Sequence, residues 1–119
     1  MQKKQKLLTS FLTATNGLKT AFKKHRNLQV MGVVALAVIA LGIFIHLIRF
    51  EWAIIILCIA LVLGLELLNS ALEETLDHLH PQFHKNVGNA KDIAAGAVLL
   101  ASIGAAIAGL FIFIPKLFF

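Results

Sequence analysis

Three long apolar runs, separated by short polar stretches, dominate the chain. They cover residues 28–48, 52–68 and 93–114. Each run approaches or exceeds the roughly 20 residues with which a helix crosses the hydrocarbon core of a bilayer. The pattern therefore predicts membrane-spanning helices over 28–48, 52–79 and 90–114. The second helix is expected to continue past its apolar run to Leu79, because Pro81 blocks further helical hydrogen bonding.

Residues 5–24 show a different pattern, with apolar side chains on one helix face and basic or polar ones largely elsewhere. The apolar positions at helical spacing are Leu7, Leu8, Phe11, Leu18 and Phe22. This pattern is typical of an amphipathic helix that lies on a membrane surface. A frayed leader held only by its charge is the alternative. We expect residues 1–119 to form one all-α membrane domain, in which this surface helix precedes three transmembrane helices.

Basic residues are concentrated near the N-terminus of the chain. The 119 residues carry a net charge of +5, and 59% of them are hydrophobic. Seven of the 11 lysines and arginines precede the first apolar run: Lys3, Lys4, Lys6, Lys19, Lys23, Lys24 and Arg26. Because basic segments beside a span stay in the cytoplasm, the charge predicts a cytoplasmic N-terminus and an outer C-terminus. This explanation is better than nucleic-acid binding, so no nucleic-acid partner is expected.

Five polar residues cluster where the second apolar run ends. They are Glu66, Asn69, Ser70, Glu73 and Asp77. At about 100° per residue, they fall within roughly one third of the helix circumference. Trp52 suits an interfacial anchor, and from it Glu66 lies roughly 21 Å and Glu73 roughly 31 Å along the helix. In a hydrocarbon core of about 30 Å, Glu66 is then in the inner leaflet and Glu73 at the cytoplasmic boundary.

Ionisable groups at membrane depth are costly and usually have a function, so the cluster predicts a site where a lipid meets a molecule from water. Asn69 and Ser70 also have a structural explanation, because either can hydrogen-bond to a neighbouring helix. Glu66 alone can be a structural or proton-carrying carboxylate. The combined spacing with Glu73 and Asp77 favours a site.

Polar residues before the third run allow two explanations. Lys91 can extend its amine to the membrane surface, and Asp92 can complete a capping box with Asn89 as the N-cap. Alternatively, Lys91 and Asp92 belong to the site. The histidines at positions 78, 80 and 84 are more typical of an exposed loop than of a zinc site, because no second ligand group has tight spacing.

Small residues line the third run at every fourth position: Ala97, Ala101, Ala105 and Gly109. Such a line permits close contact between helices in lipid, so we expect this span to be the packing centre of the bundle. Three helices shield a polar face poorly, and assembly into an oligomer is therefore expected. The single Cys58 permits no disulfide within the chain.

Two blocks of sequence resemble the prokaryotic diacylglycerol kinase family, which includes undecaprenol kinases. The blocks are Glu66-x-x-Asn69-Ser70-Ala-x-Glu73-x-x-x-Asp77 and Ala90-Lys91-Asp92-x-Ala94-Ala95-Gly96. They are long, correctly ordered and correctly separated. The resemblance implies a homotrimeric helical bundle in the bacterial inner membrane, with active sites shared between subunits. It implies transfer of the γ-phosphate of ATP to a membrane lipid alcohol, with Mg²⁺ or Mn²⁺ as the metal. Diacylglycerol and undecaprenol are the candidate acceptors.

The resemblance also implies roles for individual residues. Glu66 matches the general base and is expected to bind the lipid substrate together with Asn69 and Ser70. Glu73 matches a glutamate that holds the magnesium of ATP. The expected nucleotide-binding positions are Lys6, Glu73, Asp77, Gln82, Phe83, His84, Lys91 and Asp92.

His25 departs from the family pattern, which usually has a second metal-binding glutamate at this position. Histidine brings no negative charge and is a poor magnesium ligand. Weaker metal binding, a preference for manganese, compensation by Glu74 and loss of activity are the possible consequences. A catalytically weak or inactive membrane subunit therefore remains an alternative. So does a small proton or cation channel built around Glu66, although the middles of the first and third spans are almost purely apolar.

Overall fold

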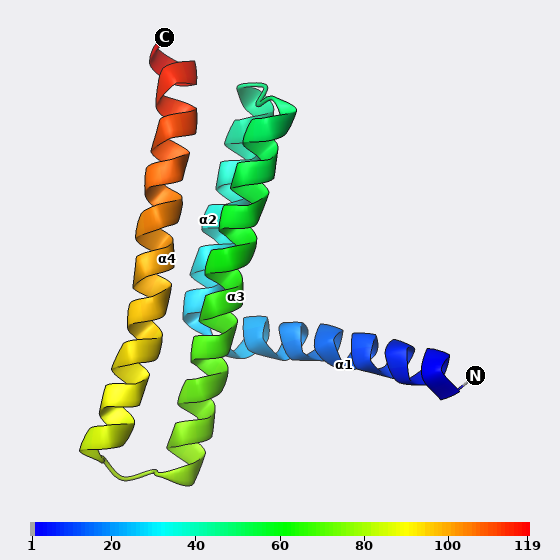
Figure 1. Cartoon of the computed structure of the whole chain (residues 1–119), viewed down its shortest axis with the longest axis vertical. Helices are drawn as coiled ribbons and strands as arrows, with labels where there is room; N and C mark the ends of the chain where they lie inside the picture. Colours follow the sequence, from blue (N-terminus) through cyan, green and yellow to red (C-terminus); the bar gives the residue numbers. More distant parts are fainter. Residues whose placement is uncertain (1) are drawn as a thin grey trace.

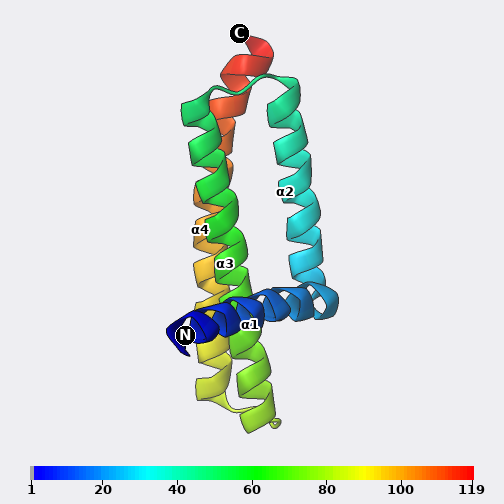
Figure 2. The same cartoon turned by 90° about the vertical axis from the view of Figure 1, so that its right-hand side faces the viewer.

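The computed structural model describes residues 2–119 as four helices joined by short connections. The helices are α1 (Gln2–Lys24), α2 (Arg26–Phe44), α3 (Arg49–Leu79) and α4 (Lys85–Phe118). Antiparallel α3 and α4 lie side by side, α2 stands next to α3, and α1 projects sideways from the bundle (Figure 1, Figure 2). The all-α class predicted from the sequence is confirmed.

Three of the helices, α2, α3 and α4, are long and apolar enough to cross a membrane. Most of their large apolar side chains are exposed in the single chain, including Val33, Leu36, Ile56, Leu57, Leu99 and Leu100. Soluble monomers rarely expose apolar patches of this extent, so these faces require lipid or other protein chains as their surroundings. The three predicted spans thus correspond to three helices with the length and composition of transmembrane segments.

Helix boundaries differ from the predicted ones at two connections. α2 ends at Phe44, because His46 takes the left-handed conformation with a φ of 58° and turns the chain toward α3. α4 begins at Lys85, and the Nδ1 atom of its N-cap His84 accepts a hydrogen bond from the backbone N–H of Asn86 at 3.2 Å. The predicted capping box was therefore wrong, since Asn89 and its partner at position 92 lie inside the helix.

The apolar core lies at the end of the bundle that contains the turn of residues 45–48, called the turn end here. Leu47, Ile55 and Ile112 are buried there against one another. Leu47 and Trp52 approach α2 so closely that a Cβ at Gly42 would lie 2.8 Å from each of them. The opposite end, which contains residues 80–84, is called the loop end; apolar packing therefore fixes the turn end more firmly than the loop end.

An ion pair closes the turn end. Lys116 of α4 lies 2.7 Å from Glu51 of α3 and donates to the carbonyl oxygen of His46 at 3.2 Å. Glu51 also accepts from the backbone N–H of Ile48 at 2.9 Å. Glu51 precedes the apolar run of α3. The hydrogen bond from Lys116, followed by that from Ile48, lowers its pKa. These contacts join the end of α4 to the connection between α2 and α3.

The small residues of α4 do not all face the same neighbour. Ala101 and Ala105 are half-buried on the same side as the buried Val98, whereas Ala97 is exposed. A Cβ added at Gly104 would meet no atom within 4 Å. Part of the predicted line therefore packs inside the chain, and the rest lies on its open surface.

Candidate active site

One face of α3 carries the polar residues that the helical spacing predicted. Glu66, Asn69 and Ser70 are 4%, 7% and 3% exposed, respectively. Glu73, one turn further on, is half-buried, and Asp77 is exposed at the loop end. The face therefore runs from a buried carboxylate among apolar side chains to an accessible one, within a single helix.

The buried part of this face is incompletely hydrogen-bonded. Ser70 Oγ donates a long hydrogen bond of 3.5 Å to Glu66 Oε1. Asn69 Oδ1 is buried without a hydrogen-bond partner among the residues that the structure describes. An unsatisfied buried acceptor costs about 1–3 kcal/mol, so a donor from a bound molecule would be favoured there. Asn69 Oδ1 is therefore a polar atom beside Glu66 with unused capacity to accept a hydrogen bond.

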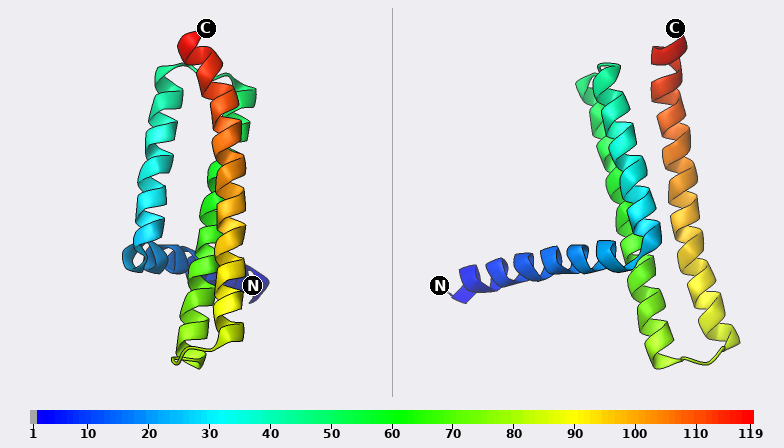
Figure 3. Two further views of the ribbon diagram at one scale, coloured as in Figure 1. Left: turned by 90° about the vertical axis from the view of Figure 1, so that its left-hand side faces the viewer. Right: turned by 180° about the vertical axis from the view of Figure 1, so that it is seen from behind.

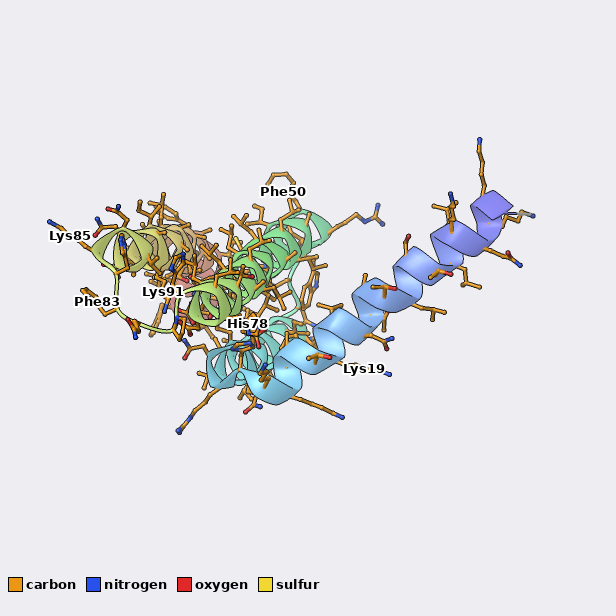
Figure 4. All side chains as sticks on the ribbon, turned by 90° about the horizontal axis from the view of Figure 1, so that it is seen from below. Lys19, Phe50, His78, Phe83, Lys85 and Lys91 are labelled. Carbon is orange, nitrogen blue, oxygen red and sulfur yellow. The ribbon has the colours of Figure 1, made fainter. Side chains whose placement is uncertain are left out.

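Lys91 of α4 reaches this face at the loop end. Its Nζ forms an ion pair with Asp77 of α3, and its side chain is less exposed than that of Asp77. Figure 4 places Lys91 between the adjoining ends of α3 and α4. Lys91 therefore belongs to the polar face rather than merely extending to the surface, while its exposed neighbour Asp92 makes no ion pair among residues 3–119.

The connection after α3 remains open to solvent. Gln82 and Phe83 are exposed, and His84 caps α4. The rings of His80 and His84 lie 6.3 Å apart, but no group of three or more His, Cys, Asp or Glu side chains that could hold a metal forms within residues 2–119. A zinc site therefore gains no support from the described residues.

The two expected metal positions differ in how well they fit a magnesium ion. Glu73 offers carboxylate oxygens, which are the ligands that Mg²⁺ prefers. His25 instead lies beside Glu74, with 3.6 Å between its Nε2 and Glu74 Oε2. Lys24 donates to the other oxygen of Glu74, and this hydrogen bond is the main reason why the pKa of Glu74, which follows the apolar run, is lowered. Glu73 fits the ion, and His25 does not.

Lys6 is the predicted site residue that the single chain does not bring to the others. It lies in the N-terminal part of α1, which extends away from α3 and α4 (Figure 3). There it lines a shallow depression together with Gln5, Thr9 and Ser10. The side chains of Leu7 and Phe11 are each 72% exposed, so residues 3–119 leave this part of the helix uncovered.

Two features of the site were missed by sequence reasoning. The contacts of Glu74 with Lys24 and His25 join α3 to the bend between α1 and α2, and the role of His84 as N-cap was not foreseen. Only the N-cap could have been anticipated from the sequence, because the ring nitrogen of a histidine can accept a hydrogen bond from the backbone N–H two residues later.

Three long helices with apolar outer faces, one of which carries a partly buried polar face, have the architecture of a multi-pass membrane protein. Comparison with known sequences gives the family. The family model of prokaryotic diacylglycerol kinase matches residues 12–113, and the chain belongs to this family. The family and the kinase class predicted from the sequence are confirmed.

Several curated proteins are similar to the chain over most of its length. A protein named undecaprenol kinase from Bacillus subtilis is 41% identical over 108 residues, which cover 91% of this chain and 88% of that protein. A diacylglycerol kinase from Synechocystis is 42% identical over 112 residues, or 93% of this chain but only 64% of that protein. A diacylglycerol kinase from Haemophilus influenzae is 34% identical over 95 residues, which cover 80% of each chain.

Proposed function

We propose that this protein transfers the γ-phosphate of ATP to the hydroxyl group of a membrane lipid alcohol. The observation that carries the proposal is the burial of Glu66 beside the unpaired Oδ1 of Asn69, on the face that ends at the ion pair of Asp77 and Lys91. Such a face allows a hydroxyl arriving through lipid and a phosphate arriving through water to meet. The names of the relatives, undecaprenol kinase and diacylglycerol kinase, support this reaction and supply the two candidate acceptors.

The buried residues would act on the lipid alcohol. Glu66 accepts the hydroxyl proton as the oxygen attacks the γ-phosphorus, while the bond from that phosphorus to the β,γ-bridging oxygen breaks and ADP leaves with its electron pair. Ser70 donates to Glu66 and orients its carboxyl group. The amide N–H of Asn69 donates to the oxygen of the bound alcohol, whose single hydroxyl proton goes to Glu66. The acceptor oxygen is thus held in place before the reaction.

The groups at the loop end would act on the nucleotide. Phosphoryl transfer depends mainly on positioning and on neutralising the phosphate charge. Lys91 presents its amine to the phosphates, and Asp77 holds that amine in position. Gln82, Phe83, His84 and Asp92 contribute to nucleotide binding from the start of α4. A magnesium ion held by Glu73 would neutralise phosphate charge when bound.

The assembly we propose is a homotrimer in the bacterial inner membrane, with α1 on the cytoplasmic surface and the C-terminus outside. The N-terminal part of α1, which contains Lys6, extends away from α3 and α4 (Figure 1), and this direction supports a site completed by α1 of another subunit. The exposed apolar faces of α2, α3 and α4 provide surfaces for both lipid and neighbouring subunits.

An acceptor panel tests the proposed reaction. Purified protein in vesicles would receive ATP with a radioactive γ-phosphate, magnesium, and either diacylglycerol or undecaprenol. We expect the label to enter the lipid extract with at least one of these alcohols and to identify the acceptor. Diacylglycerol with a methylated hydroxyl is the matched control and should remain unlabelled. Failure of both alcohols, with nucleotide bound, would favour the inactive subunit over the kinase.

His25→Glu is expected to lower the magnesium concentration that half-saturates ATP turnover, by about ten-fold or less. The substitution adds a negatively charged oxygen ligand, and ligand charge raises the affinity for hard divalent cations. Because Glu74 Oε2 lies 3.6 Å from the imidazole of His25, the new carboxylate would have an acidic neighbour and would favour a divalent cation further. A magnesium titration at fixed ATP measures the effect, with His25→Gln as the uncharged control. An unchanged titration would remove residue 25 from the metal site.

A further inference from the structure

The bend between α1 and α2 is a stiff unit built from local contacts. Gln29 Nε2 donates to the carbonyl oxygens of Phe22 at 2.8 Å and Lys23 at 3.3 Å, which the end of α1 leaves without helical donors. The ring of Phe22 lies so close to α2 that a Cβ at Gly32 would be 3.3 Å from it. The two helices therefore hold a fixed angle, and a displacement of the bend moves both.

One carboxylate of α3 holds this bend. Lys24 Nζ donates to Glu74 Oε1, and His25 Nε2 lies 3.6 Å from Glu74 Oε2. Among residues 3–119, no other side-chain hydrogen bond or ion pair joins the bend to α3. The apolar core around Leu47 lies at the distant turn end, and beside the bend itself Leu28 of α2 is fully buried, so that the polar contacts of Glu74 add to apolar packing there. Lys24 therefore supplies the hydrogen bond that joins the bend to α3, and His25 lies next to the second oxygen of the same carboxylate.

The contact of Glu74 with the bend lies close to the candidate site. Glu74 follows Glu73 directly and lies about 100° further around α3. The bend therefore lies near Glu73. Helix α1 extends from the bend and acts as a lever arm. Lys6 lies roughly 27 Å along that lever from Lys24, so a small rotation of the bend displaces the N-terminal part of α1 by many ångströms.

We propose that Glu74 is a positioning residue, which anchors the bend to α3 and thereby holds the basic helix α1 where it can meet the nucleotide. The kinetic consequence rests on the proposed kinase function, whereas the anchoring itself does not. In Glu74→Gln, α1 samples more orientations, and the apparent affinity falls with the fraction of molecules in the competent one. Because the Lys24–Glu74 pair is partly exposed, we expect the KM for ATP to rise about two- to five-fold while kcat stays within about two-fold.

Distances between two spin labels test the anchor without substrate. The labels are placed on the exposed positions Thr13 of α1 and His78 of α3, in a Cys58→Ala background in which labelled protein is diluted with unlabelled protein. We expect a narrow distance distribution in the parent and a broad one in Glu74→Gln. Lys23→Gln is the matched control, because Lys23 makes no ion pair within residues 3–119 and its loss should leave the distribution narrow.

A variant in which the two charges of the anchor are exchanged provides the second test. Lys24→Glu combined with Glu74→Lys should restore a narrow distribution and bring the KM for ATP back toward that of the parent. A distribution in Glu74→Gln as narrow as in the parent would overturn the proposal, as would a loss of kcat without any change in distance. Broadening that the exchange repairs, in a protein that phosphorylates no lipid, would support the anchor and contradict the proposed function alone.

Discussion

Glu66→Gln is expected to lower kcat by about 10²–10⁴-fold, the usual contribution of a general base. Glutamine keeps the size of the side chain and can still accept from Ser70, so the buried face should keep its packing. The loss should therefore appear in the transfer step, measured as single-turnover formation of phosphorylated lipid. Binding of a non-reacting ATP analogue should remain within about two-fold, because Glu66 lies roughly 10 Å along α3 from Glu73.

Glu51→Gln is the matched control for this variant. It removes one carboxylate from the same helix at the turn end, where Glu51 contacts Lys116 and no part of the candidate site. We expect its kcat to stay within about two-fold of the parent, since it touches none of the proposed reacting groups. Equal losses in the two variants, or a fully active Glu66→Gln, would remove Glu66 from the role of base.

Glu73→Gln has the second large expected effect, a loss of at least about 10²-fold in affinity for the metal–nucleotide complex, because a charged oxygen ligand is replaced by a neutral one. Manganese, observed by electron paramagnetic resonance in the presence of the ATP analogue, reports this loss without any turnover. The same Glu51→Gln variant should bind manganese like the parent. Unchanged manganese affinity in Glu73→Gln would exclude Glu73 as the ligand.

Much of the fold follows from local pattern. The number of long apolar helices and the shared face of Glu66, Asn69 and Ser70 depend only on the length of the apolar runs and the helical period. Both properties depend on consecutive residues and can be predicted without knowing any contact between distant segments. The burial of that face in the structure agrees with the expectation that it is directed inward.

The pattern of hydrophobic and polar residues did not predict the contacts between distant segments. Lys24 and Glu74 are 50 positions apart, and nothing near either residue marks the other as its partner. Lys116 and Glu51 are also far apart in the sequence and come together only in the folded chain. The predicted start of the last helix at residue 90 was wrong, because the helix already begins at Lys85, where His84 accepts a hydrogen bond from the backbone N–H of Asn86.

The candidate site was likewise predictable where it lies on one helix. Lys91 was one of the residues open to two explanations, and its ion pair with Asp77 places its amine beside the polar face of α3. The place of Lys6 depends on the direction in which α1 leaves the bundle and on which subunit it then meets. Neither is encoded in the spacing of residues along α1.

The most direct test is the distance between the bound metal and the acceptor hydroxyl. Protein in vesicles would be loaded with manganese, a non-reacting ATP analogue and an acceptor alcohol carrying carbon-13 at its hydroxyl-bearing carbon. Since Glu66 and Glu73 are separated by roughly 10 Å along one face of α3, manganese should broaden that carbon signal strongly, and Glu73→Gln should abolish the broadening. A sharp carbon signal while both the nucleotide and the alcohol are bound would mean that they do not share a site on α3.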